Sequence, residues 1–584
     1  MSGPLQKDKF TPELRILVAS LLSMGVILLW AKYFGPKPPA ESPQANRSAQ
    51  SAPATPGPVP SSAAGNTQAP PAATAMASTP PITVTPKNAS QERSMVIEND
   101  LYRVEISNHG AVVKSWQLKK YKDDAKPQRV LDVVHPEASQ QTGGWPFSVV
   151  LDDEQLQNAA NAGLYQTSTD GSTLHAPADV EFSWSDGHLE VAKHFRFDHT
   201  YVVRVDTSAK FDGKQIHAGL AWLGGFGDLT VTNPAPVETV STYYGESGKI
   251  NSFLYKKLDG PDKWPPGRWQ VGEDFAGIED RYFVAAFLPA NGAAPGTLAT
   301  RYWKSSRTVQ AEGQDKQEPV PQVATASVSQ PLALRVYVGP KDYDDLKKMT
   351  PPLHGLINFG WLEIISDPLF HGLKWLHGYI PNWGWTIVVL TLVINSLLFP
   401  LRISSYKTTL KMQRVAPEIK AIQERYKKYK LNDPKKQEMN KEVMAIYSRE
   451  GINPVGGCFQ MFLQMPIWIG LNRALSYAIE MRHAPWLWIR DLASKDPYFI
   501  LPVLMGLSMY LVSKMTPMTA TDPQQQAMMK VMPLTMAGMF MIMPISSGLA
   551  VYILTSSVVG IGQQWYLNRT HPVTVPAKPA RGKK

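Results

Sequence analysis

Long uncharged apolar runs divide the chain, and they indicate segments that cross a membrane. They cover residues 16–31, 375–401, 451–472, 497–513 and 531–568. Each is long enough, or nearly so, to cross a hydrocarbon layer of about 30 Å at about 1.5 Å per residue. The last run has 38 residues and as one helix would measure about 57 Å, so it has to turn back. Pro544 and the Ser546-Ser547-Gly548 step supply the break. The pattern therefore predicts six crossings.

Every part of the chain receives a range from this pattern. The crossings are predicted at 14–34, 381–401, 456–477, 497–513, 531–547 and 548–567. Around them we expect an N-terminus at 1–13, a tether at 35–93, a β-sandwich domain at 94–345, an interfacial helix at 352–380, a basic helical hairpin at 402–455, loops at 478–496 and 514–530, and a basic tail at 568–584. The predicted fold class is a multi-domain membrane protein with an α-helical bundle and an all-β domain.

The basic residues predict the orientation of the crossings. Cytoplasmic loops hold an excess of Lys and Arg, and segment 402–450 has 13 basic and 6 acidic residues. The tail after Asn568 has five basic residues and no acidic one. Both termini and the hairpin are therefore predicted to be cytoplasmic, and the β domain periplasmic. We interpret the first run as an uncleaved signal anchor, because no A-x-A-like site follows it; a cleaved signal peptide is the alternative.

Composition separates the tether from the β domain. Residues 36–92 contain 13 prolines and five charges, which is typical of an extended, disordered segment. After Ser94, apolar residues recur at every second position, for example Phe195 and Phe197, then Val203 and Val205, as in a half-buried sheet. A binding or spacing module is the expected role of this domain. An enzyme is the alternative, although its spacing shows no paired carboxylates.

The segment 352–380 has apolar residues at helical spacing and four nearby tryptophans, Trp361, Trp375, Trp383 and Trp385. Tryptophan favours the headgroup level of a membrane, so we expect an amphipathic helix on the outer interface. A core helix of the β domain is the alternative. In the hairpin, helices 404–431 and 435–449 flank an Asn432-Asp433-Pro434 turn; their charge suits anionic lipid, a ribosome or another protein, or simply a solvated surface.

Polar residues lie inside two predicted crossings, where each is costly enough to need a reason. Thr391, Asn395 and Arg402 share one face of the second crossing, and Gln460 and Gln464 are four residues apart in the third. The two faces predict a hydrophilic groove. Interhelical hydrogen bonds that hold a bundle are the alternative. For Arg473, further along the third crossing, we expect snorkelling to the outer interface.

Methionine is concentrated near the fifth crossing, because 11 of the 22 methionines lie between Met505 and Met543. Met532, Met536, Met539 and Met543 form a stripe at helical spacing. Flexible thioethers suit a surface that accepts many apolar partners; filling of a core is the other interpretation.

Several kinds of chemistry are excluded by the residues. One cysteine, Cys458, allows no intrachain disulfide. The sequence has no Cys/His cluster with zinc spacing, no phosphate-binding loop and no dinucleotide motif. We therefore expect no metal, no cofactor, no enzymatic activity and no specific recognition of nucleic acid.

Local motifs resemble the YidC/Oxa/Alb family of membrane protein insertases. They are Ile452-Asn453-Pro454-Val455-Gly456-Gly457-Cys458-Phe459, Gln464-Met465-Pro466-Ile467, Ala484-Pro485-Trp486, Asp491-Leu492, Ser547-Gly548-Leu549 and Tyr552. The resemblance covers essentially the whole chain and implies a Gram-negative inner-membrane protein with a five-helix core and a periplasmic β-supersandwich. It also implies nascent membrane proteins as substrates, and the Sec translocon, ribosomes and the signal recognition pathway as partners.

The resemblance further implies two surfaces. A cytoplasm-open hydrophilic groove would include Thr391, Asn395, Arg402, Gln460 and Gln464. An apolar slide into lipid would be formed by Met461, Met465, Met532, Met536, Met539, Met543 and Tyr552. The chain departs from the family at Asn395, where an arginine is usual, so attraction of acidic substrate tails depends on whether Arg402 or Arg473 replaces that charge.

Two other classes of protein remain as alternatives. A small-molecule secondary transporter with a periplasmic binding domain would place carboxylates near the membrane midplane, but no Asp or Glu lies inside a predicted crossing. A structural envelope protein would not need polar faces on two crossings.

Overall fold

The structure is a computed structural model of the chain, and it is described for part of the sequence. The described residues are 85–125, 127–169, 171–228, 230, 241–246, 249–254, 269–270, 275–290, 297–311, 314–328, 333–357, 359, 362–429, 433–452, 459–516, 535–536, 538–541 and 545–572. The predicted N-terminal segment, signal anchor and most of the tether lie outside these residues, as do residues 517–530 of the predicted loop 514–530.

The β domain contains three sheets within the described residues. The first has β4 (Val130–Asp132), β3 (Val112–Lys122), β2 (Tyr102–Ser107), β1 (Ser94–Glu98) and β7 (Thr173–His175). The second has β14 (Lys249–Leu254), β13 (Ser241–Glu246), β16 (Phe275–Glu279), β17 (Phe283–Pro289), β20 (Ala333–Pro340), β10 (Val202–Phe211), β9 (Leu189–Phe197), β8 (Ala178–Ser185) and β6 (Gln166–Thr167), with β11 (Lys214–Gln215) beside β10. The third has β15 (Trp269–Gln270), β18 (Thr297–Ala311), β19 (Gln314–Val328), β12 (Ala218–Trp222) and β5 (Ser148–Leu151).

Alternation along the strands agrees with the predicted all-β domain. On β9, Leu189, Val191, Phe195 and Phe197 are buried, and the residues on the opposite face of the strand are more exposed. The same buried row contains Lys193, which is 0% exposed. Its Nζ donates hydrogen bonds to the carbonyl oxygens of Gly110 (2.7 Å), Ala111 (3.0 Å) and Phe147 (2.8 Å). A lysine therefore links two backbone segments, one at Gly110 and Ala111 and one at Phe147, in the core of the domain.

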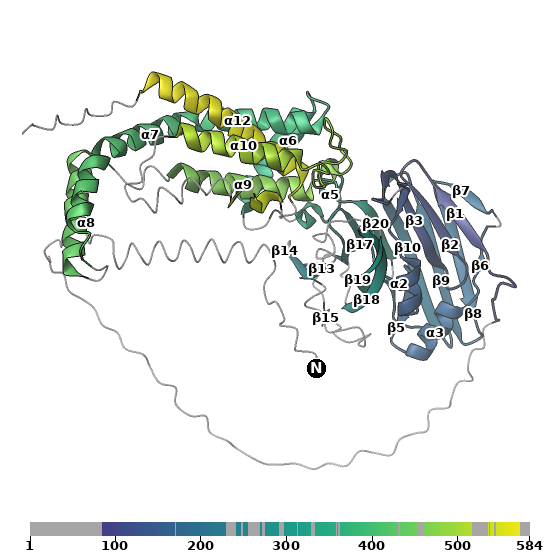
Figure 1. Ribbon diagram of the computed structural model, residues 1–584. Helices are drawn as coiled ribbons and strands as arrows, with labels where there is room; N and C mark the ends of the chain where they lie inside the picture. The colour runs from purple at the N-terminus through teal and green to yellow at the C-terminus, as the bar shows by residue number, and fades with distance from the viewer. Residues whose placement is uncertain are drawn as a thin grey trace, which may run out of the picture.

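The helices fall into two groups. Short helices α2 (Pro136–Thr142), α3 (Glu154–Ala162) and α5 (Tyr343–Lys347) accompany the sheets, and the turn η2 (His354–Leu356) follows α5. The long helices are α6 (Glu363–His377), α7 (Trp383–Arg425), α8 (Pro434–Arg449), α9 (Phe459–Tyr477), α10 (Ile500–Met515) and α12 (Ser547–Thr570), with the turn η5 (Ile479–Met481) after α9. In Figure 1 the long helices form a bundle beside the β domain, and α8 lies at the far end of α7.

Within the bundle, α12 packs between α7 and α10, and α6 packs along α9. Helices α7, α10 and α12 begin on the side of the β domain, where α9 ends (Figure 1). At Gly470 of α9, an added Cβ would lie 3.0 Å from Ile365 Cγ2, so the missing side chain allows α6 to approach closely. Ile364 and Trp375 of α6 remain 84% and 64% exposed, as expected of an amphipathic helix.

Helix α7 does not end at residue 401, where we expected the crossing to give way to the hairpin. It continues through Pro400 and Pro417 to Arg425, over 43 residues. A proline inside a helix removes one backbone hydrogen bond and bends the helix, but neighbouring turns can continue across it. Among the described residues, α7 is the helix whose length and hydropathy suffice to span a membrane; α10 is apolar but shorter.

A helical hairpin is nevertheless present, built from the second half of α7 and from α8. Asp433 caps α8 by accepting from Lys435 N, and Pro434 occupies the first turn. The two arms share a buried apolar cluster that includes Ile419, Ile422 and Ile446. Ion pairs cross between them, Arg449 to Glu418 at 2.8 Å and Arg425 to Glu442 at 2.9 Å.

Helices occupy the predicted second, third, fourth and sixth crossings. The predicted fifth crossing, 531–547, is described only at 535–536 and 538–541, which are helical, and at 545–547, where α12 begins. The number of crossings therefore stays a prediction.

Candidate functional site: a polar seam along helix α12

The polar residues of α7 are buried against α12. Thr391 is 0% exposed and its Oγ1 donates to Ile387 O at 2.6 Å. Asn395 is 7% exposed, and its Nδ2 donates to Thr391 O at 2.9 Å. The other side-chain atom, Oδ1, accepts from Ser556 Oγ of α12 at 3.3 Å. Both polar atoms of the Asn395 side chain are thus already bonded within the helices.

Arg402 lies about two turns further along α7 and also bonds to α12. Its Nη1 donates to Gln563 Oε1 at 2.9 Å, and its Nη2 donates to Gly560 O at 3.3 Å. The amide of Gln563 also donates from Nε2 to Asn395 O at 3.2 Å. The guanidinium is therefore held by neutral partners.

Helix α9 contributes Gln464, whose Nε2 donates to the Tyr552 hydroxyl of α12 at 2.8 Å. Tyr552, Ser556, Gly560 and Gln563 are separated by four, four and three residues, so they follow one face of α12. We call the set Asn395, Arg402, Gln464, Tyr552, Ser556 and Gln563 the polar seam. The sequence predicted that polar faces of the second and third crossings would line one groove; in the structure, Asn395 and Arg402 of α7 and Gln464 of α9 all bond to α12.

At the end of the seam, amides join three helices. Tyr406 of α7 donates to Asn568 Oδ1 at 2.8 Å, and Gln564 Nε2 donates to the same oxygen at 3.0 Å. Asn568 Nδ2 in turn donates to Met515 O of α10 at 3.0 Å. These bonds fix the ends of α7, α10 and α12 relative to one another.

The contribution of α12 was missed in the sequence. Ser556, Gln563, Gln564 and Asn568 lie in the uncharged run 531–568, where the predictions rested on the lack of charge and on the methionines. The signal was available, because Gln563, Gln564 and Asn568 are three amides close together at the end of a predicted crossing, where polar side chains are costly.

The predicted slide residues have different surroundings. Met465 and Met539 are 36% and 44% exposed, whereas Met536 is half-buried against the core. Tyr552 is 1% exposed and lies in the polar seam, so its position differs from the one we expected on the slide. Met532 and Met543 lie outside the described residues, as do the side chains of Gln460 and Met461. Arg473 is partly buried on α9.

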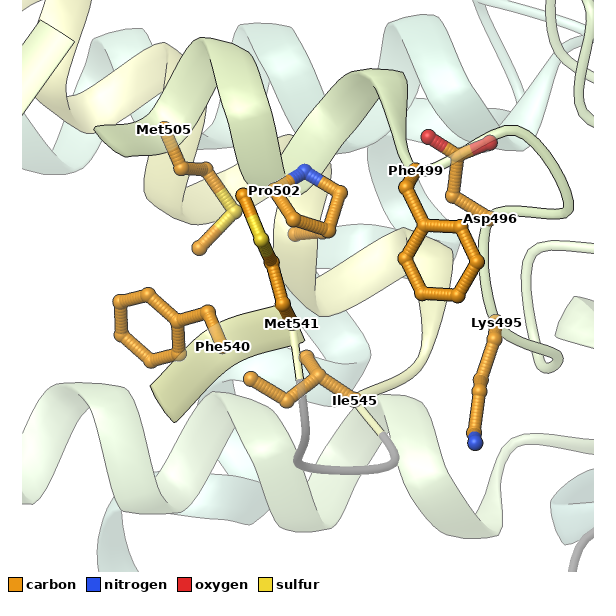
Figure 2. Close-up of a pocket in the computed structure, with 9 residues that line it drawn as sticks. Lys495, Asp496, Phe499, Pro502, Met505, Phe540, Met541 and Ile545 are labelled. Atoms are coloured by element: carbon orange, nitrogen blue, oxygen red, sulfur yellow. The ribbon is translucent and has the colours of Figure 1, made fainter. Parts of the chain in front are cut away.

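A small cavity lies between the start of α10, residues 540–541 and α12. Figure 2 shows Phe499, Pro502, Met505 and Phe540 around it, with Asp496 at its edge. Its volume is about 20 Å³, enough for one water. Asp496 accepts from Leu501 N at 2.6 Å and from Trp488 Nε1 at 3.1 Å, so its carboxylate is used to begin α10. We interpret the cavity as a packing gap.

A buried ionic cluster joins the helices to the β domain. The Arg482 side chain is 4% exposed; it forms an ion pair with Asp228, which is 2% exposed, and donates to Lys122 O at 2.8 Å. His483 contacts Asp124 at 2.7 Å. Burial raises the pKa of Asp228, so the charge of this carboxylate depends on Arg482. We call Arg482, His483, Asp124 and Asp228 the junction cluster.

Asp124, His483 and Asp491 also bring possible metal-ligand atoms within 4.8 Å of one another. Their hydrogen bonds account for the arrangement: Asp491 accepts from the backbone nitrogens of His483 and Ala493, each at 2.9 Å. The Arg482 guanidinium, 3.6 Å from Asp124, would repel a cation. We therefore assign no metal here.

Comparison with known proteins places the two halves of the chain in two family models. Residues 94–372 match the YidC periplasmic domain, and residues 375–574 match the 60Kd inner membrane protein. The membrane protein insertase YidC of Burkholderia multivorans is 33% identical over 520 residues, covering 87% of this chain and 88% of that relative. The insertase YidC of Citrifermentans bemidjiense is 32% identical over 569 residues, covering 95% and 99%.

A solved structure described as an active YidC insertase with its first transmembrane domain resolved is also similar. It has 15% identity and a TM-score of 0.34, and the match covers 83% of this chain and 95% of that one. The resemblance seen in the local motifs is confirmed by the identity with the curated relatives over most of the chain. This chain belongs to the YidC family of membrane protein insertases.

Proposed function

We propose that this insertase receives the polar end of a nascent membrane protein at the polar seam. The observation that supports this concerns the hydrogen-bond partners of Arg402. Its described hydrogen-bond partners are an amide and a carbonyl, and within the described part of the chain it has no acidic partner. A cation between membrane helices without a counter-ion is costly, and a carboxylate of the substrate would supply that counter-ion.

The orientation of the helices supports a cytoplasmic position for Arg402. It lies 19 residues after the start of α7, hence about 28 Å along the helix axis, at the end of the bundle away from the β domain. If the β domain is periplasmic, Arg402 lies near the inner face of a hydrocarbon layer of about 30 Å. Both termini and the α7–α8 hairpin are then cytoplasmic, where basic residues suit anionic lipid; ribosomes and the Sec translocon remain proposed partners.

The proposed mechanism requires no fuel for the apolar part of the substrate. Burial of an apolar segment of about 20 residues in lipid is favourable, and the barrier is the transfer of the attached polar segment. Hydrogen-bond donors and acceptors along α12 would lower that barrier partway across the membrane. The exposed Met465 and Met539 would then present an adaptable surface to the departing apolar segment.

Arg402→Gln tests the role of the seam in vivo. We expect insertion of substrates with acidic translocated tails to fall roughly fivefold, as for the loss of about 1 kcal/mol of ionic attraction, while neutral tails are affected less. The measurement is protease protection of tail variants at equal insertase levels. Lys411→Gln is the matched control, since it removes a charge from an exposed position of the same helix. Equal effects on acidic and neutral tails would make Arg402 a positive-inside anchor.

A second test concerns the methionine stripe. Replacing Met532, Met536, Met539 and Met543 together by leucine nearly preserves volume and apolarity, so the fold should tolerate it. We expect insertion of some substrates to decline several-fold and that of others to persist, because leucine adapts less to differently shaped partners. Met505→Leu, at a position 1% exposed, is the control. Uniform retention across a substrate panel would assign the stripe to packing.

A further inference from the structure

Gln563 connects two residues of α7 in the polar seam, Arg402 and Asn395. Its Oε1 accepts from Arg402 Nη1 at 2.9 Å, and its Nε2 donates to Asn395 O at 3.2 Å. A glutamine amide has an acceptor and a donor at opposite ends, so the two bonds together fix its orientation. Leucine or methionine at this position would provide neither bond, and glutamate would provide only the first.

Gly560 provides the second contact between the Arg402 guanidinium and α12. Its carbonyl oxygen accepts from Nη2 at 3.3 Å, and a Cβ added at this residue would lie 3.3 Å from Nη1 and 3.5 Å from Nη2. The first of these contacts is tight and the second is ordinary, so a side chain at 560 would shift the guanidinium by a few tenths of an ångström. The missing side chain at Gly560 and the amide of Gln563 thus together determine where the Arg402 guanidinium lies.

The guanidinium of Arg402 still has N–H groups that can bind a further partner. Arginine has five N–H donors in a planar fork, and two of them bond Gln563 and Gly560. The other three have no bonded partner within the described residues, and Arg402 is only partly buried. A carboxylate can accept two parallel bonds from such a fork. Asn395 cannot substitute, because it carries no charge, and one Nδ2 hydrogen and the Oδ1 atom already bond Thr391 O and Ser556 Oγ.

We propose that Gln563 is a positioning residue for substrate specificity: with the Gly560 carbonyl, it holds Arg402 in the seam so that the free side of the guanidinium binds a carboxylate in the polar segment of the substrate. The inference rests on the proposed function of the seam. The ligand is an acidic peptide segment that precedes or follows an apolar one.

The test uses the purified full chain in proteoliposomes and two single-spanning substrates that differ only in their tails, one with aspartates and one with asparagines. The readout is the ratio of acidic to neutral tails protected from protease. In Gln563→Glu, the new carboxylate pairs with Arg402 and competes with the substrate, so we expect the ratio to fall about fivefold. In Gln563→Met, the guanidinium loses its fixed position, and we expect a similar fall.

Ser556→Ala is the matched control. It removes the bond to the Asn395 side chain but leaves both partners of Arg402, so we expect it to change the insertion of the two tails equally. The ratio separates positioning from damage to the fold, because a misfolded insertase loses both tails together. Should one Gln563 variant fail to fold, the other still decides.

Two outcomes would overturn the inference, and they differ in what else they overturn. If both Gln563 variants keep the wild-type ratio while Arg402→Gln lowers it, Arg402 acts without being positioned by Gln563. The proposed function of the seam then stands. If Arg402→Gln also keeps the ratio, the seam does not bind acidic tails, and the proposed function fails with the inference.

Discussion

Replacing Arg482 by methionine is expected to destabilise the contact between the β domain and the helices by about 3–5 kcal/mol. The substitution keeps an apolar stem but leaves Asp228, 2% exposed, as a buried carboxylate without its cation. An unpaired buried charge costs far more than a lost surface pair. We would measure hydrogen exchange of the full chain in detergent, at the amides of β17 and of residues 478–496, and expect faster exchange at both.

An exposed ion pair of the β domain supplies the control for the junction cluster. Arg129 pairs with Asp123 at 3.1 Å, but its side chain is 71% exposed, so Arg129→Met should cost less than about 1 kcal/mol. Adding Asp228→Asn to Arg482→Met should recover part of the loss, because the uncompensated charge is then gone. If Arg482→Met and Arg129→Met have equal effects on exchange, the cluster does not hold the two parts together.

Lys193→Met is expected to destabilise the β domain by roughly 3 kcal/mol or more, because three buried carbonyl oxygens lose their donor. Two of these oxygens belong to Ala111 (φ 46°) and Phe147 (φ 67°), and the third to Gly110 (φ 73°). Non-glycine residues in the left-handed region are strained, so the ammonium also stabilises an unfavourable backbone. Pulse proteolysis of the full chain in a urea series gives the free energy of unfolding.

The same substitution should change how stability depends on pH. Burial lowers the pKa of Lys193 from 10.5 to about 7. Between these values the unfolded chain binds more protons than the folded one, so the stability of the wild type should rise with pH, by up to about 1.4 kcal/mol per unit. The variant should lack this slope. Lys210→Met on β10, an exposed position, should keep it; identical slopes in wild type and Lys193→Met would show that the ammonium keeps its ordinary pKa in the fold.

Local patterns predicted the elements, whereas the partners of the polar side chains depend on contacts between distant segments. Period-two alternation predicted the buried face of β9 because burial of Phe195 and Phe197 requires only that one face be covered. Lys193 lies on that face too, but its acceptors are 46 to 83 residues away. No local pattern contains that information.

The candidate site shows the same division. The cost of polar residues in a crossing singled out Asn395, Arg402 and Gln464 from residue type alone. Their partners, Ser556, Gln563 and Tyr552, are 161, 161 and 88 residues away. Choosing α12 as the common partner required the packing of the helices. Likewise the uncharged run ended the predicted crossing at residue 401, whereas α7 continues to Arg425, where its second half packs on α8.

Because α7 is continuous, a single helix joins the bundle to the hairpin. With 43 residues, α7 is about 65 Å long, roughly twice the thickness of the apolar layer. A tilt of about 10° in the half of α7 nearer to α8 would move the α8 end by about 5 Å, given the length of that half. Prolines 400 and 417 are the natural hinges, since each removes a backbone hydrogen bond. A displacement of the hairpin would therefore reach Arg402, two residues from Pro400, along one helix that bends at Pro417 and contains no loop.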